Sequence, residues 1–163
     1  MNLLHELFAV VFIGCGATLL MDVWLMFLKR LGVQTLNFAF IGRWVGHLSR
    51  GRVAHAAIGK APPVRHELAL GWLTHYAVGI AFAGLLVVMV GHGWVAAPSL
   101  LPAVALGIGT VVFPLFLMQP AMGQGVAASR TPAPLRNCLR SVLNHAVFGL
   151  GLFLSASVIA PLF

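Results

Sequence analysis

Apolar residues dominate four stretches of this sequence, and polar residues gather in the segments between them. The stretches cover residues 7–28, 68–90, 97–118 and 139–160. Each is close to the roughly 20 residues with which an α-helix crosses a hydrocarbon layer of about 30 Å. The pattern predicts an all-α, integral membrane four-helix bundle. Residues 1–163 would then be a single transmembrane domain with loops at about residues 29–67 and 119–138.

Composition and charge support this class and add an orientation. The chain is 60% hydrophobic and 8% charged, with a mean hydropathy of +0.98, far from the values of soluble domains. Seven of the ten Lys and Arg residues lie between the first two stretches, and the other three lie between the third and the fourth or at the start of the fourth. The positive-inside rule therefore predicts that both loops face the cytoplasm of a bacterial inner membrane and that both termini are periplasmic. This orientation and anionic lipids explain the net charge of +7, so we expect membrane lipids as partners and no nucleic acid.

The first loop has its own pattern. Between Leu36 and Arg50 it mixes apolar and aromatic residues with arginine and histidine, which is typical of an amphipathic interfacial helix. Pro62 and Pro63 then prevent a helix until the second stretch begins. The loop carries two histidines, His47 and His55, which either cover a site beneath the loop or are ordinary interfacial residues.

The second and fourth stretches share a motif. Residues 72–82 read WLTHYAVGIAF and residues 142–152 read VLNHAVFGLGL. An offset of 70 positions places His75 on His145 and Gly79 on Gly149. We interpret the two copies as parallel-repeat helical hairpins, with a site built between them.

The acidic residue Asp22 is the strongest functional feature of the first stretch. It follows Gly14 and Thr18 at spacings of four on one helix face, and a carboxylate inside a membrane is costly unless it is paired or protonated. Helix geometry gives it about the same depth as the two repeated histidines. Imidazole and carboxylate together bind a transition-metal ion or relay a proton. We therefore expect a metal or proton site of Asp22, His75, His145 and Glu67.

Further polar residues would surround this site. At its mouth and around its ligands we expect His47, Thr18, Asn144 and Ser141. An anion or lipid headgroup would contact Arg43 and Arg130.

Two other functions remain open. Paired histidines are also the ligands of haem b in an electron-transfer membrane subunit, or they only hold the two repeats together in an assembly module without a ligand. No motif indicates an enzyme. A chain of 17.3 kDa is compatible with a homodimer and with a subunit of a larger membrane complex.

Five segments together resemble a family of small bacterial inner-membrane proteins known as domain of unknown function 2938. The resemblance is carried by Ala17–Trp24, Gly42–His47, Glu67 with Gly71–Tyr76, Gly123–Pro132, and His145 with Phe148–Leu152. It extends over the full length and implies an uncharacterised inner-membrane protein. It brings no activity, so the roles above rest on the residues alone.

Overall fold

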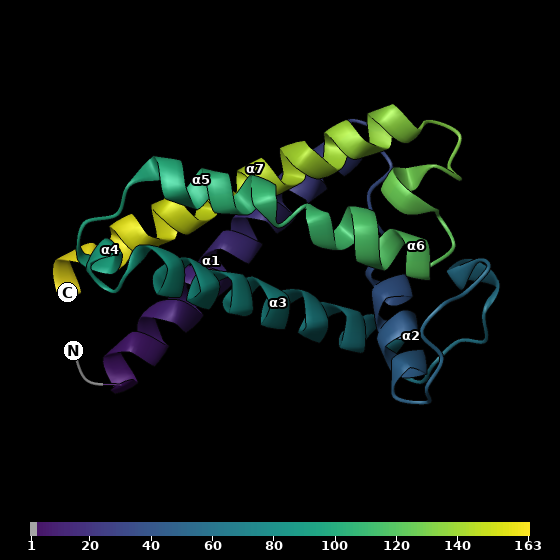
Figure 1. The fold of residues 1–163 in the computed structure, drawn as a ribbon, viewed down its shortest axis with the longest axis horizontal. Coiled ribbons are helices and arrows are strands. Elements are labelled where there is room, and N and C mark those ends of the chain that lie inside the picture. The colour runs from purple at the N-terminus through teal and green to yellow at the C-terminus, as the bar shows by residue number, and fades with distance from the viewer. Residues whose placement is uncertain (1–2) are drawn as a thin grey trace. The chain divides into compact units, whose positions relative to one another are not determined.

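The computed structural model describes residues 3–163, which form helices and no strand (Figure 1). Four of the helical segments are long and apolar enough to cross a membrane. They are α1 (Leu3–Arg30), α3 (Glu67–Val90), the third span (Leu100–Ala121) and the fourth span (Pro134–Leu162). The predicted all-α class with four membrane helices is confirmed.

The third and fourth spans are composite. The third contains α5 (Leu100–Gly109), the π-helical segment η2 (Phe113–Met118) and α6 (Gln119–Ala121). The fourth contains α7 (Pro134–Ile159) and the 3₁₀ turn η4 (Ala160–Leu162). Proline at a first helical position needs no hydrogen-bond acceptor, so α7 starts earlier than the apolar stretch at residue 139.

A proline also marks the interruption of the third span. The α-helix ends at Gly109, and Pro114 near the start of η2 has no N–H to donate. The backbone continues as a π-helix, in which the N–H of Gln119 donates to the carbonyl of Pro114.

The first loop contains the expected helix. It is α2 (Phe38–Leu48), and the side chain of Asn37 caps it by accepting from the N–H of Ala39 at 3.0 Å. The chain then forms the short η1 (Ile58–Lys60) and passes Pro62 and Pro63 before α3 begins. Two further short helices, α4 (Gly93–Ala96) and η3 (Val126–Ala128), lie in later connections.

The chain folds into two compact units, each with its own core. The α1 unit consists of the residues up to Gln34, Tyr76–Thr110 and Leu143–Phe163, and the α2 unit of Thr35–His75 and Val111–Val142. Ile13, Leu86 and Leu152 lie fully buried in the core of the α1 unit. In the same unit, α4 lies against η4 near the C-terminus (Figure 1). The core of the α2 unit contains Ile58, Ala61 and Met122, packed against Phe40, Trp44 and Met118.

Large apolar side chains point outward along the spans. Leu101 is 80% exposed, Val88 77% and Val158 69%. In water such a surface would drive aggregation, whereas lipid chains solvate it. The exposed side chains therefore fit the membrane assignment.

Glycines bring two helix pairs of the α1 unit into backbone contact. A Cβ on Gly14 of α1 would lie 2.5 Å from Cα of Ile80 in α3. A Cβ on Gly107 of α5 would lie 2.6 Å from Cα of Gly149 in α7. Small residues permit this close approach of membrane helices. Each of the two helix pairs therefore contains one such close contact.

Candidate functional site

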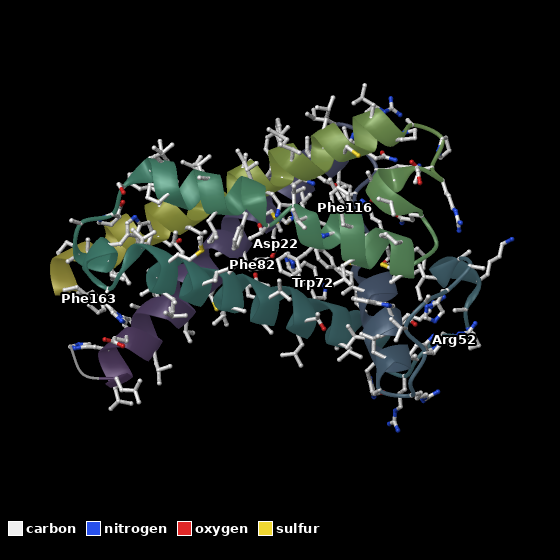
Figure 2. The ribbon with its side chains drawn as sticks, in the orientation of Figure 1. Asp22, Arg52, Trp72, Phe82, Phe116 and Phe163 are labelled. Atoms are coloured by element: carbon white, nitrogen blue, oxygen red, sulfur yellow. The ribbon has the colours of Figure 1, made fainter. Side chains whose placement is uncertain are left out.

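Asp22 of α1 is buried and hydrogen-bonded inside the α1 unit (Figure 2). The residue is only 7% exposed, and its helix has the length and composition of a membrane span. The hydroxyl of Tyr76, in α3, donates to its Oδ2 atom at 3.0 Å. The carboxyl group thus belongs to the contact between α1 and α3.

The turn of α1 that precedes Asp22 explains how α3 comes so close. Thr18 is 1% exposed, and its hydroxyl donates to the carbonyl of Gly14 at 2.7 Å within the same helix. Gly79 of α3 faces this threonine, and any Cβ there would collide with the Thr18 hydroxyl oxygen. The absence of a side chain at Gly79 therefore lets the polar face of α1 lie directly on α3.

The second pair of spans presents a histidine in a related way. The Thr110 hydroxyl donates to the carbonyl of Gly107 at 2.6 Å and lies 2.8 Å from Nδ1 of His145. A hydroxyl has a single hydrogen to donate, so Nδ1 of His145 carries a hydrogen and donates to Thr110. In this tautomer Nε2 is the ring nitrogen without a hydrogen.

One hydrogen bond joins α1 to α7 close to these two groups. Nε1 of Trp24 donates to Oδ1 of Asn144 at 3.0 Å. Trp24 follows Asp22 by two residues, and Asn144 directly precedes His145. The bond therefore fixes the two helices near Asp22 and His145.

His75 belongs to the α2 unit and lies in an aromatic cluster. Its ring centroid is 4.7 Å from that of Phe38 and 6.0 Å from that of Trp72, and the last two rings stack at 4.2 Å. Figure 2 shows Trp72 on α3.

Glu67 forms an ion pair with Arg43 in the α2 unit. Nε of Arg43 donates to Oε2 at 2.8 Å and Nη2 donates to Oε1 at 2.7 Å. Nη1 of Arg43 also donates to three carbonyls of the loop before α3, those of Ile58, Gly59 and Ala61, at 3.1–3.3 Å. The N–H of Val64 donates to Oε2 of Glu67 at 3.0 Å, just before α3 begins. This network gives both charged groups a structural role in holding the loop on α2 and α3.

Two loop histidines form a buried pair in the same unit. His47 and His55 are 5% and 6% exposed, and Nδ1 of His47 lies 2.6 Å from Nε2 of His55. Their rings stack at 4.9 Å with an interplanar angle of 26°. Among the described side chains, only Nδ1 of His55 and Oε1 of Gln119 are buried without a hydrogen-bond partner.

The remaining predicted residues lie elsewhere in the α2 unit. Ser141 is half-buried on α7, and Arg130 is exposed in the connection before α7. In residues 3–163, no group of three or more His, Cys, Asp and Glu side chains is arranged to hold a metal ion.

Several contacts of the candidate sites were not predicted from the sequence, and two of them show why. The Thr110–His145 bond lacks a local signal, because its partners are 35 positions apart. The His47–His55 pair had only a weak signal. A spacing of eight residues across the turn at Gly51 allows the chain to fold back on α2 but does not require it.

Four membrane-length helices with buried polar groups define a multi-pass membrane protein. The sequence matches the family described as protein of unknown function (DUF2938) over residues 11–159, nearly the whole chain, and the protein therefore belongs to this family, as the sequence motifs indicated. No curated protein and no solved structure matches the chain.

Proposed function

We propose that this protein is a small multi-pass protein of the bacterial inner membrane, with periplasmic termini, that binds and releases a proton at Asp22. The observation that carries the proposal is the burial of a carboxyl group in a membrane-length helix, with the Tyr76 hydroxyl 3.0 Å from one oxygen. Ionisable side chains inside membrane spans are costly and mark ion or proton pathways in many proteins.

Two features of Asp22 bear on proton exchange. A charge buried in a low dielectric loses its hydration, which makes a carboxylate in a membrane span costly. The Tyr76 hydroxyl donates to Oδ2 of Asp22, and a hydroxyl donates well to a charged oxygen. Proton exchange at Asp22 would draw on both effects.

His145 is the second proton acceptor in this proposal. Its Nδ1–H is held by Thr110, which orients the imidazole between α5 and α7. The Trp24–Asn144 bond supports α1 and α7 next to both groups. Asp22 and His145 therefore belong to one compact unit whose helix contacts are fixed by hydrogen bonds and glycines.

A transition-metal ion is the second candidate. Imidazole and carboxylate are common ligands of such ions, and His145 and Asp22 supply one of each in the α1 unit. Both candidates use the same residues, so one set of variants tests them together.

The small number of acidic residues makes the proton proposal directly testable. Glu6, Asp22 and Glu67 are the only acidic side chains, so a carboxyl signal can be assigned by three substitutions. Infrared difference spectra of protein in lipid nanodiscs, recorded as the pH changes, should show the carbonyl band of a buried carboxylic acid. Asp22→Asn should remove this band, whereas Glu6→Gln and Glu67→Gln should retain it. A band that persists in Asp22→Asn would overturn the proposal.

The alternatives have distinct readouts in the same preparation. A stoichiometric metal that is lost in both Asp22→Asn and His145→Leu would support the metal ion, and a Soret band would identify a haem subunit. Proton conduction would acidify liposomes that contain a pH-sensitive dye, and Asp22→Asn would abolish the flux.

The orientation is tested by labelling single cysteines. With Cys15 and Cys138 replaced by serine, a cysteine at exposed Ala97 should react with an impermeant maleimide in intact cells. A cysteine at exposed Ser129 should react only after the membrane is permeabilised. The reverse result would refute the periplasmic placement of the termini.

A further inference from the structure

The pair of loop histidines in the α2 unit is a titratable site that the proposed function does not use. His47 comes from α2, and His55 from the segment between α2 and η1. Their nitrogens are 2.6 Å apart, and both residues are less than a tenth exposed. Burial of two imidazoles in direct contact makes their protonation interdependent.

We propose that His47 and His55 form a second proton-binding site, independent of Asp22, which takes up one proton with its N–H···N bond intact and opens when it takes up another.

Counting hydrogens leads to this behaviour. The bond needs one hydrogen between Nδ1 of His47 and Nε2 of His55. In the neutral pair, one of the two outer nitrogens, Nε2 of His47 or Nδ1 of His55, has no hydrogen. The first proton binds there and leaves the shared hydrogen in place. A second proton would put a hydrogen on both facing nitrogens, and two donors cannot hydrogen-bond to each other.

The charges around the pair oppose the second step. Burial lowers the pKa of the His55 imidazole, and the positive charges of Arg52 and His47 lower it further. Arg52 lies on the same loop as His55 (Figure 2). Arg43 of α2 is neutralised by Glu67 of α3, whose negative charge also acts on His47. The short helix α6, which His55 contacts, has the sequence Gln-Pro-Ala and adds no charge.

The pair holds a loop against α6. The backbone N–H of His55 donates to the carbonyl of Ala121 at 2.8 Å, and that of Ile58 donates to Met122 at 3.0 Å. A Cβ on Gly123 would collide with the carbonyl of Ala56, so the two backbones are in close contact. Opening the histidine pair should therefore loosen the segment from His55 to Ile58, which becomes measurable by hydrogen exchange.

The first test is a pH titration of the histidines by ¹⁵N NMR, on the full-length protein in nanodiscs. In the wild type, the pair should titrate in two steps separated by more than about one pH unit, as expected for strongly coupled sites. His47→Gln should convert the titration of His55 to a single step, and His55→Gln should do the same for His47. His66→Gln is the matched control, because His66 is an exposed histidine of the same loop and should leave both steps unchanged.

A second measurement needs no substitution. Hydrogen exchange of residues 53–60, corrected for the intrinsic effect of pH, should lose protection at the pH of the second step. The proposal is refuted if both histidines titrate in one step in the wild type or if protection is constant across that pH range. Asp22→Asn should leave these histidine signals unchanged, so failure of the proposed function would not imitate failure of this site.

Discussion

Replacing Arg43 by methionine should destabilise the protein much more than replacing Glu67 by glutamine. The two side chains share a bidentate ion pair, but Arg43 alone also holds three loop carbonyls. Their side chains are 11% and 19% exposed, so water compensates little for a lost partner. Methionine keeps much of the length of arginine and removes its charge and all of its donors.

The expected losses follow from the groups left behind. Arg43→Met strands a mostly buried carboxylate, which costs about 3–5 kcal/mol. Each of the three carbonyls adds about 0.5–1.5 kcal/mol where water does not replace the donor. In Glu67→Gln the guanidinium still donates to those carbonyls and to the new amide oxygen. We therefore expect a loss of unfolding free energy of about 1.5–3 kcal/mol, the range of hydrogen bonds to charged groups.

The assay is denaturant unfolding in detergent micelles, followed by far-ultraviolet circular dichroism. Arg43→Met, Glu67→Gln and the double variant form a double-mutant cycle, with an expected coupling of about 1–3 kcal/mol. Arg65→Met removes an exposed arginine of the same loop and should change stability by less than about 0.5 kcal/mol.

Two results would refute the reasoning. If the two single substitutions add within about 0.5 kcal/mol in the double variant, the groups do not act as a pair. If Glu67→Gln is as destabilising as Arg43→Met, the three loop carbonyls contribute nothing.

Three further predictions concern packing, a tautomer and pH. Gly14→Leu should destabilise the protein by more than the roughly 1–3 kcal/mol of ordinary overpacking, because its Cβ would meet backbone atoms of α3. Gly109→Ala has open space around it and lies in a helix, so it should stabilise the protein by about 0.5–1 kcal/mol in the same unfolding assay. Thr110→Val should shift the His145 proton away from Nδ1 in ¹⁵N spectra and Thr110→Ser should not; identical spectra for both variants would contradict the assigned tautomer. The free energy of unfolding should fall as the pH drops below about 6.5, the ordinary histidine pKa. Burial lowers the pKa of His55 in the folded protein, so the unfolded chain binds the proton first. His55→Gln should reduce the dependence of the unfolding free energy on pH.

The sequence determined the elements well, because each has a local cause. Apolar length defined the four spans, and the pattern after Leu36 predicted α2. Pro62 and Pro63 delayed the start of α3 as expected. Proline also identified the disturbed part of the third span, although the π-helical form of η2 depends on hydrogen-bond choices that composition does not encode.

The site was harder, because its partners come from distant parts of the chain. Asp22 was predicted as a site residue because it is a carboxylate in an apolar stretch. Nothing local in the sequence indicates that Tyr76, 54 positions away, donates to it. Glu67 and Arg43 were assigned to separate roles, and only the fold brings them together. Helix periodicity predicts which face a residue occupies, whereas the partner on the facing helix depends on how the helices cross.

The glycine contacts also determine how variation among relatives should be interpreted. Gly14, Gly107 and Gly149 meet backbone atoms of a neighbouring helix, so any side chain there would force the helices apart whatever the protein does. Relatives that had lost the proposed proton chemistry would still keep these glycines, while Asp22 and His145 would be free to change. Invariance at the glycines would therefore identify relatives that share the fold, and invariance at Asp22 and His145 would identify those that share the proposed proton chemistry.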